Sequence, residues 1–191
     1  MFASVVLCES DREAPARDRE PRHRILAAVV YNEQSYPDEI FKRVVDRCRL
    51  QGTRMAGVVQ HRARDPGHSC DMLLEDLATG RKTSIFADRG HGAKGCQMDE
   101  DAMLQLVSGI ELALKNGSDL VVLNKFGKVE AEGRGMRDLI AQAVCLDIPL
   151  IVGVPARHLQ SWREFAREFS VELNSSDDVD EWLGRHLAKR G

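Results

Sequence analysis

The sequence predicts an α/β fold: a mostly parallel sheet of three-layer type, covered by helices on both faces. Three observations lead to this prediction. Apolar runs of strand length alternate along the chain with segments of helical periodicity. These runs are apolar at nearly every position, as in strands that are buried on both faces. Two further short strands flank the turn sequence ATGR, which predicts a β-hairpin inserted into the alternation.

The first half of the chain supplies two strands, a helix and the hairpin. In order, we expect a strand at 25–31, a helix at 38–50, a strand at 55–60 and hairpin strands at 70–77 and 82–87. The helix has a buried stripe of Ile40, Val44 and Cys48, with Phe41 and Val45 beside it. Proline before this helix and glycine after it suit its two ends.

The second half continues the alternation. We expect a helix at 99–115, strands at 119–124, 149–154 and 171–173, and helices at 136–146, 158–169 and 179–187. Asp99 is placed to cap the first of these helices, and Asn116-Gly117 to end it. The buried face of that helix is expected to hold Met103, Val107, Ile110 and Leu114.

Length and composition indicate a globular protein. The 191 residues suit one α/β domain at 25–191, preceded by a disordered tail at 1–24 that is almost free of apolar side chains after residue 8. A net charge of -3 gives no overall attraction for nucleic acid, and no apolar run approaches the roughly 20 residues of a membrane span. A cytoplasmic location is therefore the default expectation, and five cysteines without a CxxC pair fit a reducing compartment.

In a parallel sheet, ligands bind at the carboxyl ends of the strands. The loop after the first strand, YNEQSYPDE, has neither the glycines nor the lysine of a phosphate-binding loop. Asp38 and Glu39 in the following helical turn would repel phosphate, and Pro37 removes an N–H donor. This loop either caps the helix, or it contacts the edge of a ligand through residues such as Asn32.

A second loop, at 89–96, is rich in glycine and carries two cations. Glycines let successive backbone N–H groups point inward around an anion. The candidate anion-binding residues here are Arg89, Gly90, Gly92, Lys94 and Gly95. The alternative is a surface loop without a ligand.

A third loop follows the strand at 119–124. Its candidate binding residues for an anion or nucleotide are Asn124, Lys125, Gly127, Lys128 and Arg134. Glu130 and Glu132 are candidates to bind Mg²⁺ or a water molecule. The alternative is a charged, solvated loop.

Histidines and cysteines also gather in one region of the sequence, without the spacing of a zinc site. They are His61, His68, Cys70, His91 and Cys96. We assign no metal ligand and no catalytic residue, and the cofactor stays open.

Three motifs, HSCDMLLEDLATG, RGHGAKGCQMD and LNKFGKVEAEGRG, resemble an uncharacterised bacterial family that is often encoded beside molybdate-transport or nitrogen-fixation genes. The resemblance covers about residues 24–172. More distantly, the order of elements is similar to small P-loop nucleoside-triphosphatases of the archaeal and cancer-related type. The first resemblance implies a role around molybdenum, and the second implies the fold.

The chain departs from the P-loop pattern at two places. Residues 31–37 stand where the phosphate loop belongs, and Asn124 and Lys125 stand where the magnesium-site acids belong. Gly127, Lys128 and Glu130 still match. Phosphoryl transfer depends on the lysine and magnesium that these places supply, so the resemblance implies a scaffold without its catalytic groups.

Three hypotheses about function follow. The first is a protein that binds an oxyanion such as molybdate, or a nucleotide, on a degenerate P-loop-like scaffold. The second is a divergent nucleoside-triphosphatase that uses Glu130 or Glu132 with magnesium. The third is a protein-interaction module, in contact with a transport or cofactor-assembly protein. A homodimer is compatible with each of them.

Overall fold

The computed structural model describes residues 24–32, 35–62, 72–87 and 97–187. Seven strands form one sheet in the order β4-β3-β2-β7-β8-β1-β9. They are β1 (Leu26–Tyr31), β2 (Met55–Arg62), β3 (Met72–Asp76), β4 (Lys82–Ser84), β7 (Leu120–Leu123), β8 (Leu150–Pro155) and β9 (Ser170–Leu173). Strands β2, β7, β8, β1 and β9 are parallel, whereas β3 and β4 form an antiparallel hairpin at one edge. The expected α/β class and hairpin are confirmed.

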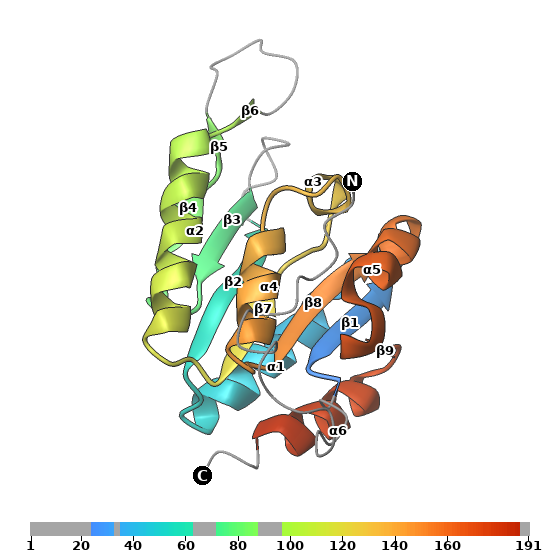
Figure 1. Cartoon of the computed structure of the whole chain (residues 1–191). Coiled ribbons are helices and arrows are strands. Elements are labelled where there is room, and N and C mark those ends of the chain that lie inside the picture. Colours follow the sequence, from blue (N-terminus) through green and yellow to red (C-terminus); the bar gives the residue numbers. More distant parts are fainter. Residues whose placement is uncertain (1–23, 33–34, 63–71, 88–96, 188–191) are drawn as a thin grey trace, which may run out of the picture.

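Helices cover both faces of the sheet (Figure 1). They are α1 (Asp38–Leu50), α2 (Glu100–Lys115), α3 (Lys128–Ala131), α4 (Arg137–Cys145), α5 (Leu159–Ala166) and α6 (Ser176–Leu187). One core cluster joins α1 and α6 to alternate strand residues such as Ala27 and Val122. The other joins α2, α4 and α5 to the intervening residues, such as Ala28 and Val121. This alternation is what strands buried on both faces require.

Helix α2 shows how the local sequence sets an element's ends. The Asp99 carboxylate accepts a hydrogen bond from the backbone N–H of Ala102 at 3.0 Å, which is the expected N-terminal cap. The helix ends at Lys115 with Asn116 as its C-terminal cap, and Gly117 has a φ of 88°. Its buried face is rotated slightly from the expected one, because Leu106 is buried while Met103 and Val107 are only partly covered.

Three expectations needed correction. The helix expected at 158–169 ends at Ala166, because Arg167 has a φ of 46° and the chain turns into β9 through a short 3-10 segment. The strand expected at 82–87 is divided into β4 and β5 (Phe86–Ala87), and β5 pairs with β6 (Gln97–Met98) in a separate small sheet. The loop after β7 contains α3. The expected tail, apart from Arg24, and the loop at 88–96 lie outside the described residues.

Neighbouring strands β1 and β8 define the point where a ligand crevice is expected. They are paired in parallel, with Tyr31 opposite Pro155 at their carboxyl ends. The chain leaves β1 for α1 on one face of the sheet and leaves β8 for α5 on the other face. In open α/β sheets, such a reversal of direction opens a crevice at the carboxyl edge.

Candidate functional site at the carboxyl edge

The turn between β1 and α1 is tied to the end of β7. The Tyr36 hydroxyl lies 3.0 Å from the main-chain oxygen of Asn124 and 2.5 Å from its side-chain oxygen. The Asn124 amide in turn donates to the side-chain oxygen of Gln60, at 3.1 Å. These bonds connect the carboxyl ends of β2 and β7 with the turn that stands where a phosphate loop would be.

Aromatic rings fill the inner side of this turn. The Tyr36 ring contacts Tyr31 edge-on at 5.4 Å between centroids and stacks on Phe41 at 5.7 Å. A side chain at Gly153 in β8 would not fit here, because its Cβ would lie 2.7 Å from the Asn124 carbonyl oxygen. Glycine at this position therefore allows the β7 exit and the aromatic turn to pack closely against β8.

The electrostatics of the turn do not favour phosphate. Burial raises the pKa of Tyr31 to about 12, although nearby Arg157 acts to lower it. Burial also raises the pKa of Tyr36, so both hydroxyls stay neutral near pH 7. The first turn of α1 carries Asp38 and Glu39, and the described residues of the turn (31–32 and 35–39) include no lysine or arginine. Aromatic packing thus occupies the turn at which a phosphate-binding loop would be expected.

The loop after β7 is organised by a buried carboxylate. One oxygen of Glu130 accepts the N–H of Gly127 at 2.8 Å, and the other accepts the N–H of Met136 at 3.1 Å. Glu130 is 9% exposed. Gly135 has a φ of 67°, and a Cβ there would lie 2.2 Å from the nearer Glu130 oxygen. Glu130 therefore closes the loop at 127–136, a role that sequence reasoning did not assign to it.

The other end of this loop is anchored in the core. Phe126 is fully buried against Trp162 and Phe165, and its N–H donates to the Gly153 oxygen at 2.8 Å. The side chains of Lys128 and Arg134, between the buried Phe126 and Met136, stay exposed. Lys128 and Arg134 both pair with Glu132, at 3.7 and 2.9 Å. The Arg134 hydrogen bond, with help from Lys128, holds the pKa of Glu132 below its usual value.

Most of the candidate binding residues in the described part of the chain lie in a single loop. One loop at the carboxyl edge brings together Asn124, Lys125, Gly127, Lys128, Glu130, Glu132 and Arg134. Asn32 is exposed in the neighbouring turn, where its main-chain oxygen accepts the N–H of Ser35. The candidates Arg89, Gly90, Gly92, Lys94 and Gly95 lie outside the described residues. The binding roles of all these residues stay predictions.

A groove that the sequence did not indicate runs between α1 and the hairpin. Its volume is about 420 Å³, and its walls include Tyr36, Phe41 and Val59. Glu75, only 5% exposed, forms part of its wall, and its two oxygens lie 2.6 Å from Arg49 and 2.5 Å from His61.

The groove's buried carboxylate is held ionised by its neighbours. Burial alone would raise the pKa of Glu75, but the hydrogen bonds and charges of Arg49 and His61 outweigh it, so this pKa lies below its usual value. Lys82 adds a third positive neighbour at 3.8 Å. An acid among apolar strand residues, LLED, was the available signal in the sequence. Its partners Arg49, His61 and Lys82 come from α1, β2 and β4, and one sequence does not reveal how these elements pack together.

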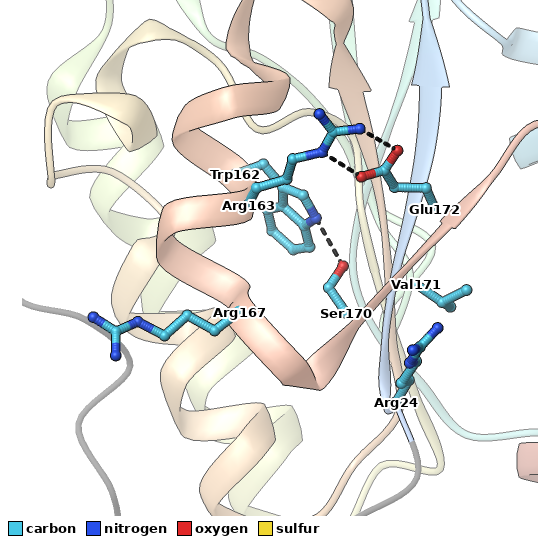
Figure 2. A pocket seen from close by; sticks show the side chains of 7 residues that line it. All are labelled: Arg24, Trp162, Arg163, Arg167, Ser170, Val171 and Glu172. Carbon is cyan, nitrogen blue, oxygen red and sulfur yellow. Dashed lines mark hydrogen bonds and ion pairs between the residues drawn. The ribbon is translucent and has the colours of Figure 1, made fainter.

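A second hollow lies at the opposite edge of the sheet, beside the amino ends of β1 and β9 (Figure 2). Its volume is about 340 Å³. Arg163 binds Glu172 through two hydrogen bonds of 2.6 and 2.9 Å, and the Trp162 indole N–H donates to Ser170 at 2.8 Å. Figure 2 shows Arg167 extending away from these side chains. The contacts that line this hollow fasten α5 to β9.

The fold defines the class: a mostly parallel α/β sheet with helices on both faces, consistent with a P-loop nucleoside-triphosphatase-like scaffold. Within that class, the chain belongs to the family described as "Protein of unknown function (DUF2478)", whose model matches residues 26–182. No solved structure matches the chain. Among the described residues, no helix is long and apolar enough to cross a membrane.

One curated relative is informative. The chain is 32% identical over 167 residues to the protein "Molybdenum import ATP-binding protein ModC 2" of Bradyrhizobium diazoefficiens. The match covers 86% of this chain but 18% of that protein. The similarity therefore extends over nearly the whole fold described above, and it concerns a small part of a much longer relative.

Proposed function

We propose that this protein binds a small oxyanion or a nucleotide at the carboxyl edge of its sheet and serves molybdenum uptake. The observation that carries the proposal is the match of 86% of the chain to a segment of a molybdenum import ATP-binding protein. Molybdate and the phosphates of ATP share one chemistry, negatively charged oxygens, which backbone N–H groups and cations recognise.

The third loop is the proposed place of binding. It lies at the carboxyl edge, and it presents Lys125, Lys128 and Arg134 on a segment fixed by Phe126 and Glu130. Lys128 and Arg134 share Glu132, so an incoming anion would compete with one exposed carboxylate. Exposed ion pairs of this kind contribute little stability, which leaves these cations available to a ligand.

Binding without hydrolysis is the form of activity that this geometry supports best. The aromatic turn at Tyr36 offers no lysine to a transferred phosphoryl group, and Asp38 and Glu39 follow it directly. Both oxygens of Glu130 are already used by backbone N–H groups. Removing the cationic and metal-binding groups removes most of the stabilisation on which phosphoryl transfer depends.

Calorimetric titration of the whole chain with molybdate, sulfate and magnesium-ATP tests this proposal. We expect molybdate or ATP to bind, and the double variant Lys125→Ala/Lys128→Ala to weaken binding at least about tenfold. Lys42→Ala, on α1, is the matched control and should leave the affinity unchanged. Sulfate separates recognition of molybdate from a general response to tetrahedral dianions. Equal affinity in the double variant would refute the site, and no heat with any of the three ligands would refute binding.

A second candidate function has an observation of its own. Because the match covers 18% of the longer relative, the corresponding segment there shares a chain with other segments. A protein-interaction module in the same uptake system would fit this arrangement. It predicts that the chain co-purifies with an ATP-binding transport subunit and that the titrations give no signal.

A further inference from the structure

The outer face of α2 carries apolar side chains that the fold does not bury. The inner face packs Leu106, Ile110 and Leu114 into the core, whereas Leu104 is 66% and Leu112 is 59% exposed. Among the described residues, five large hydrophobic side chains are exposed, and α2 holds two of them. Figure 1 shows α2 along one side of the molecule.

The exposed residues of this face are arranged symmetrically about Ser108. Leu104 precedes Ser108 by four residues, and Leu112 follows it by four. Asp101 precedes Ser108 by seven residues, and Lys115 follows it by seven. At about 100° per residue, all four lie within roughly 40° of Ser108 around the helix axis. All five residues are exposed and form one continuous face.

Such a face is complementary to itself when a second copy runs in the opposite direction. We propose that α2 is a self-association surface, on which two copies of this chain pair their α2 helices antiparallel about a twofold axis at Ser108. Each Leu104 then faces Leu112 of the second copy, and each Asp101 faces Lys115 of the second copy. A twofold interface requires this relation, since a contact from one residue to another must be returned.

The chemistry of the individual positions supports a second copy as the partner. Serine at the centre is small, so two helices can approach closely there. Asp101 and Lys115 are exposed and of opposite charge, so they can form ion pairs across the interface. The acid lies at the amino end of α2 and the base at its carboxyl end, and antiparallel pairing brings these ends together. A partner unrelated to this chain would not require that symmetry.

The size of the face sets the expected strength. One pair of four-turn helices buries less surface than the standard interface of about 1,600 Å². We therefore expect a weak dimer in rapid exchange, which forms as the concentration rises. This expectation does not depend on the proposed ligand, because the face lies on a helix and the proposed binding loop lies after β7.

Analytical ultracentrifugation of the full chain over a concentration series tests the proposal. Wild type should show dimers that increase with concentration. Asp101→Lys and Lys115→Asp should each raise the dissociation constant roughly tenfold, because like charges then face each other. The double variant Asp101→Lys/Lys115→Asp should recover it to within about twofold. Leu104→Ser/Leu112→Ser should abolish the dimer.

Two controls keep this test decisive. Leu50→Ser removes a leucine of α1 that is even more exposed, at 89%, and should leave the dimer unchanged. Thermal melting of each variant reports whether the fold is retained. A wild type that stays monomeric at every concentration would overturn the proposal. A dimer unaffected by both charge reversals and by the leucine pair would place self-association elsewhere and would overturn it equally.

Discussion

The Tyr36 hydroxyl lies 3.0 Å from the main-chain oxygen of Asn124, although 88 residues separate them in sequence. This contact joins the turn after β1 to the exit of β7, the two places that the resemblance to P-loop nucleoside-triphosphatases predicts for phosphate and magnesium. In this chain the turn after β1 and the exit of β7 are hydrogen-bonded to each other. Neutral hydrogen bonds and aromatic packing therefore link these two segments, while the nearby cations are Arg157, after β8, and those farther along the loop after β7.

Removing the Tyr36 hydroxyl should destabilise the fold. In Tyr36→Phe the two Asn124 oxygens lose their donor, and we expect the free energy of unfolding to fall by about 1–2 kcal/mol in urea titrations. Tyr31→Phe is the matched control, because the Tyr31 hydroxyl makes no hydrogen bond within the described residues. Equal losses in both variants would show that the Tyr36–Asn124 contact contributes nothing of its own.

Two glycines with similar backbone angles should respond differently to alanine. Gly80 has a φ of 73° and open space where the methyl group of an alanine would lie, so Gly80→Ala should cost about 1–2 kcal/mol from backbone strain alone. Gly135 has a φ of 67°, but a methyl group there would overlap the Glu130 carboxylate. Gly135→Ala should therefore cost about 1–3 kcal/mol more, measured by urea unfolding. Indistinguishable losses would contradict the tight closure of this loop.

Variants of Glu130 and Glu132, the two glutamates of the third loop, should differ in their effect on stability. Glu130→Gln turns an amide NH₂ toward one of two backbone donors and should lower the melting temperature by several degrees. Glu132→Gln, at the exposed position, should melt as wild type does. Magnesium-dependent phosphate release that disappears in Glu130→Gln without a change in melting would instead establish the triphosphatase hypothesis.

Lowering the pH should reduce the stability that the ionised Glu75 side chain contributes to the fold. Because the folded-state pKa of this carboxyl lies below its unfolded value, its ionisation stabilises the fold above about pH 4.3. That contribution is lost as the pH falls through the lower, folded-state pKa. In urea unfolding from pH 7 to pH 3, the difference between wild type and Glu75→Gln should shrink toward the acid end. A constant difference over that range would mean that the charge on Glu75 does not matter.

Much of the fold was predictable because its signals are local. Apolar runs indicated the parallel strands, and Asp99 and Asn116-Gly117 marked the ends of α2. The break in α5 was not predictable, since it depends on the positive φ of Arg167 where the chain turns into β9. The role of Glu130 was missed for a related reason: its two donors, Gly127 and Met136, meet only after the loop folds.

The candidate site was predictable as a place rather than as a mechanism. The loop after β7 lies at the carboxyl edge because β7 is parallel to its neighbours, and its cations can be read from the sequence. The contact of Tyr36 with Asn124 could not be foreseen, because it depends on how β8 brings the two loops together at Gly153. The surroundings of Glu75 depend in the same way on the register between β2, β3 and β4.

Anion binding by the loop after β7 can be measured residue by residue, by following the backbone amide chemical shifts of the ¹⁵N-labelled chain during titration. Molybdate and magnesium-ATP would be added in separate experiments, with sodium chloride as the ionic-strength control. We expect saturable shifts that are largest between residues 125 and 134 for at least one of the two ligands. Shifts concentrated around Glu75 or around Ser170, or no saturable shift with either ligand, would contradict binding at this loop.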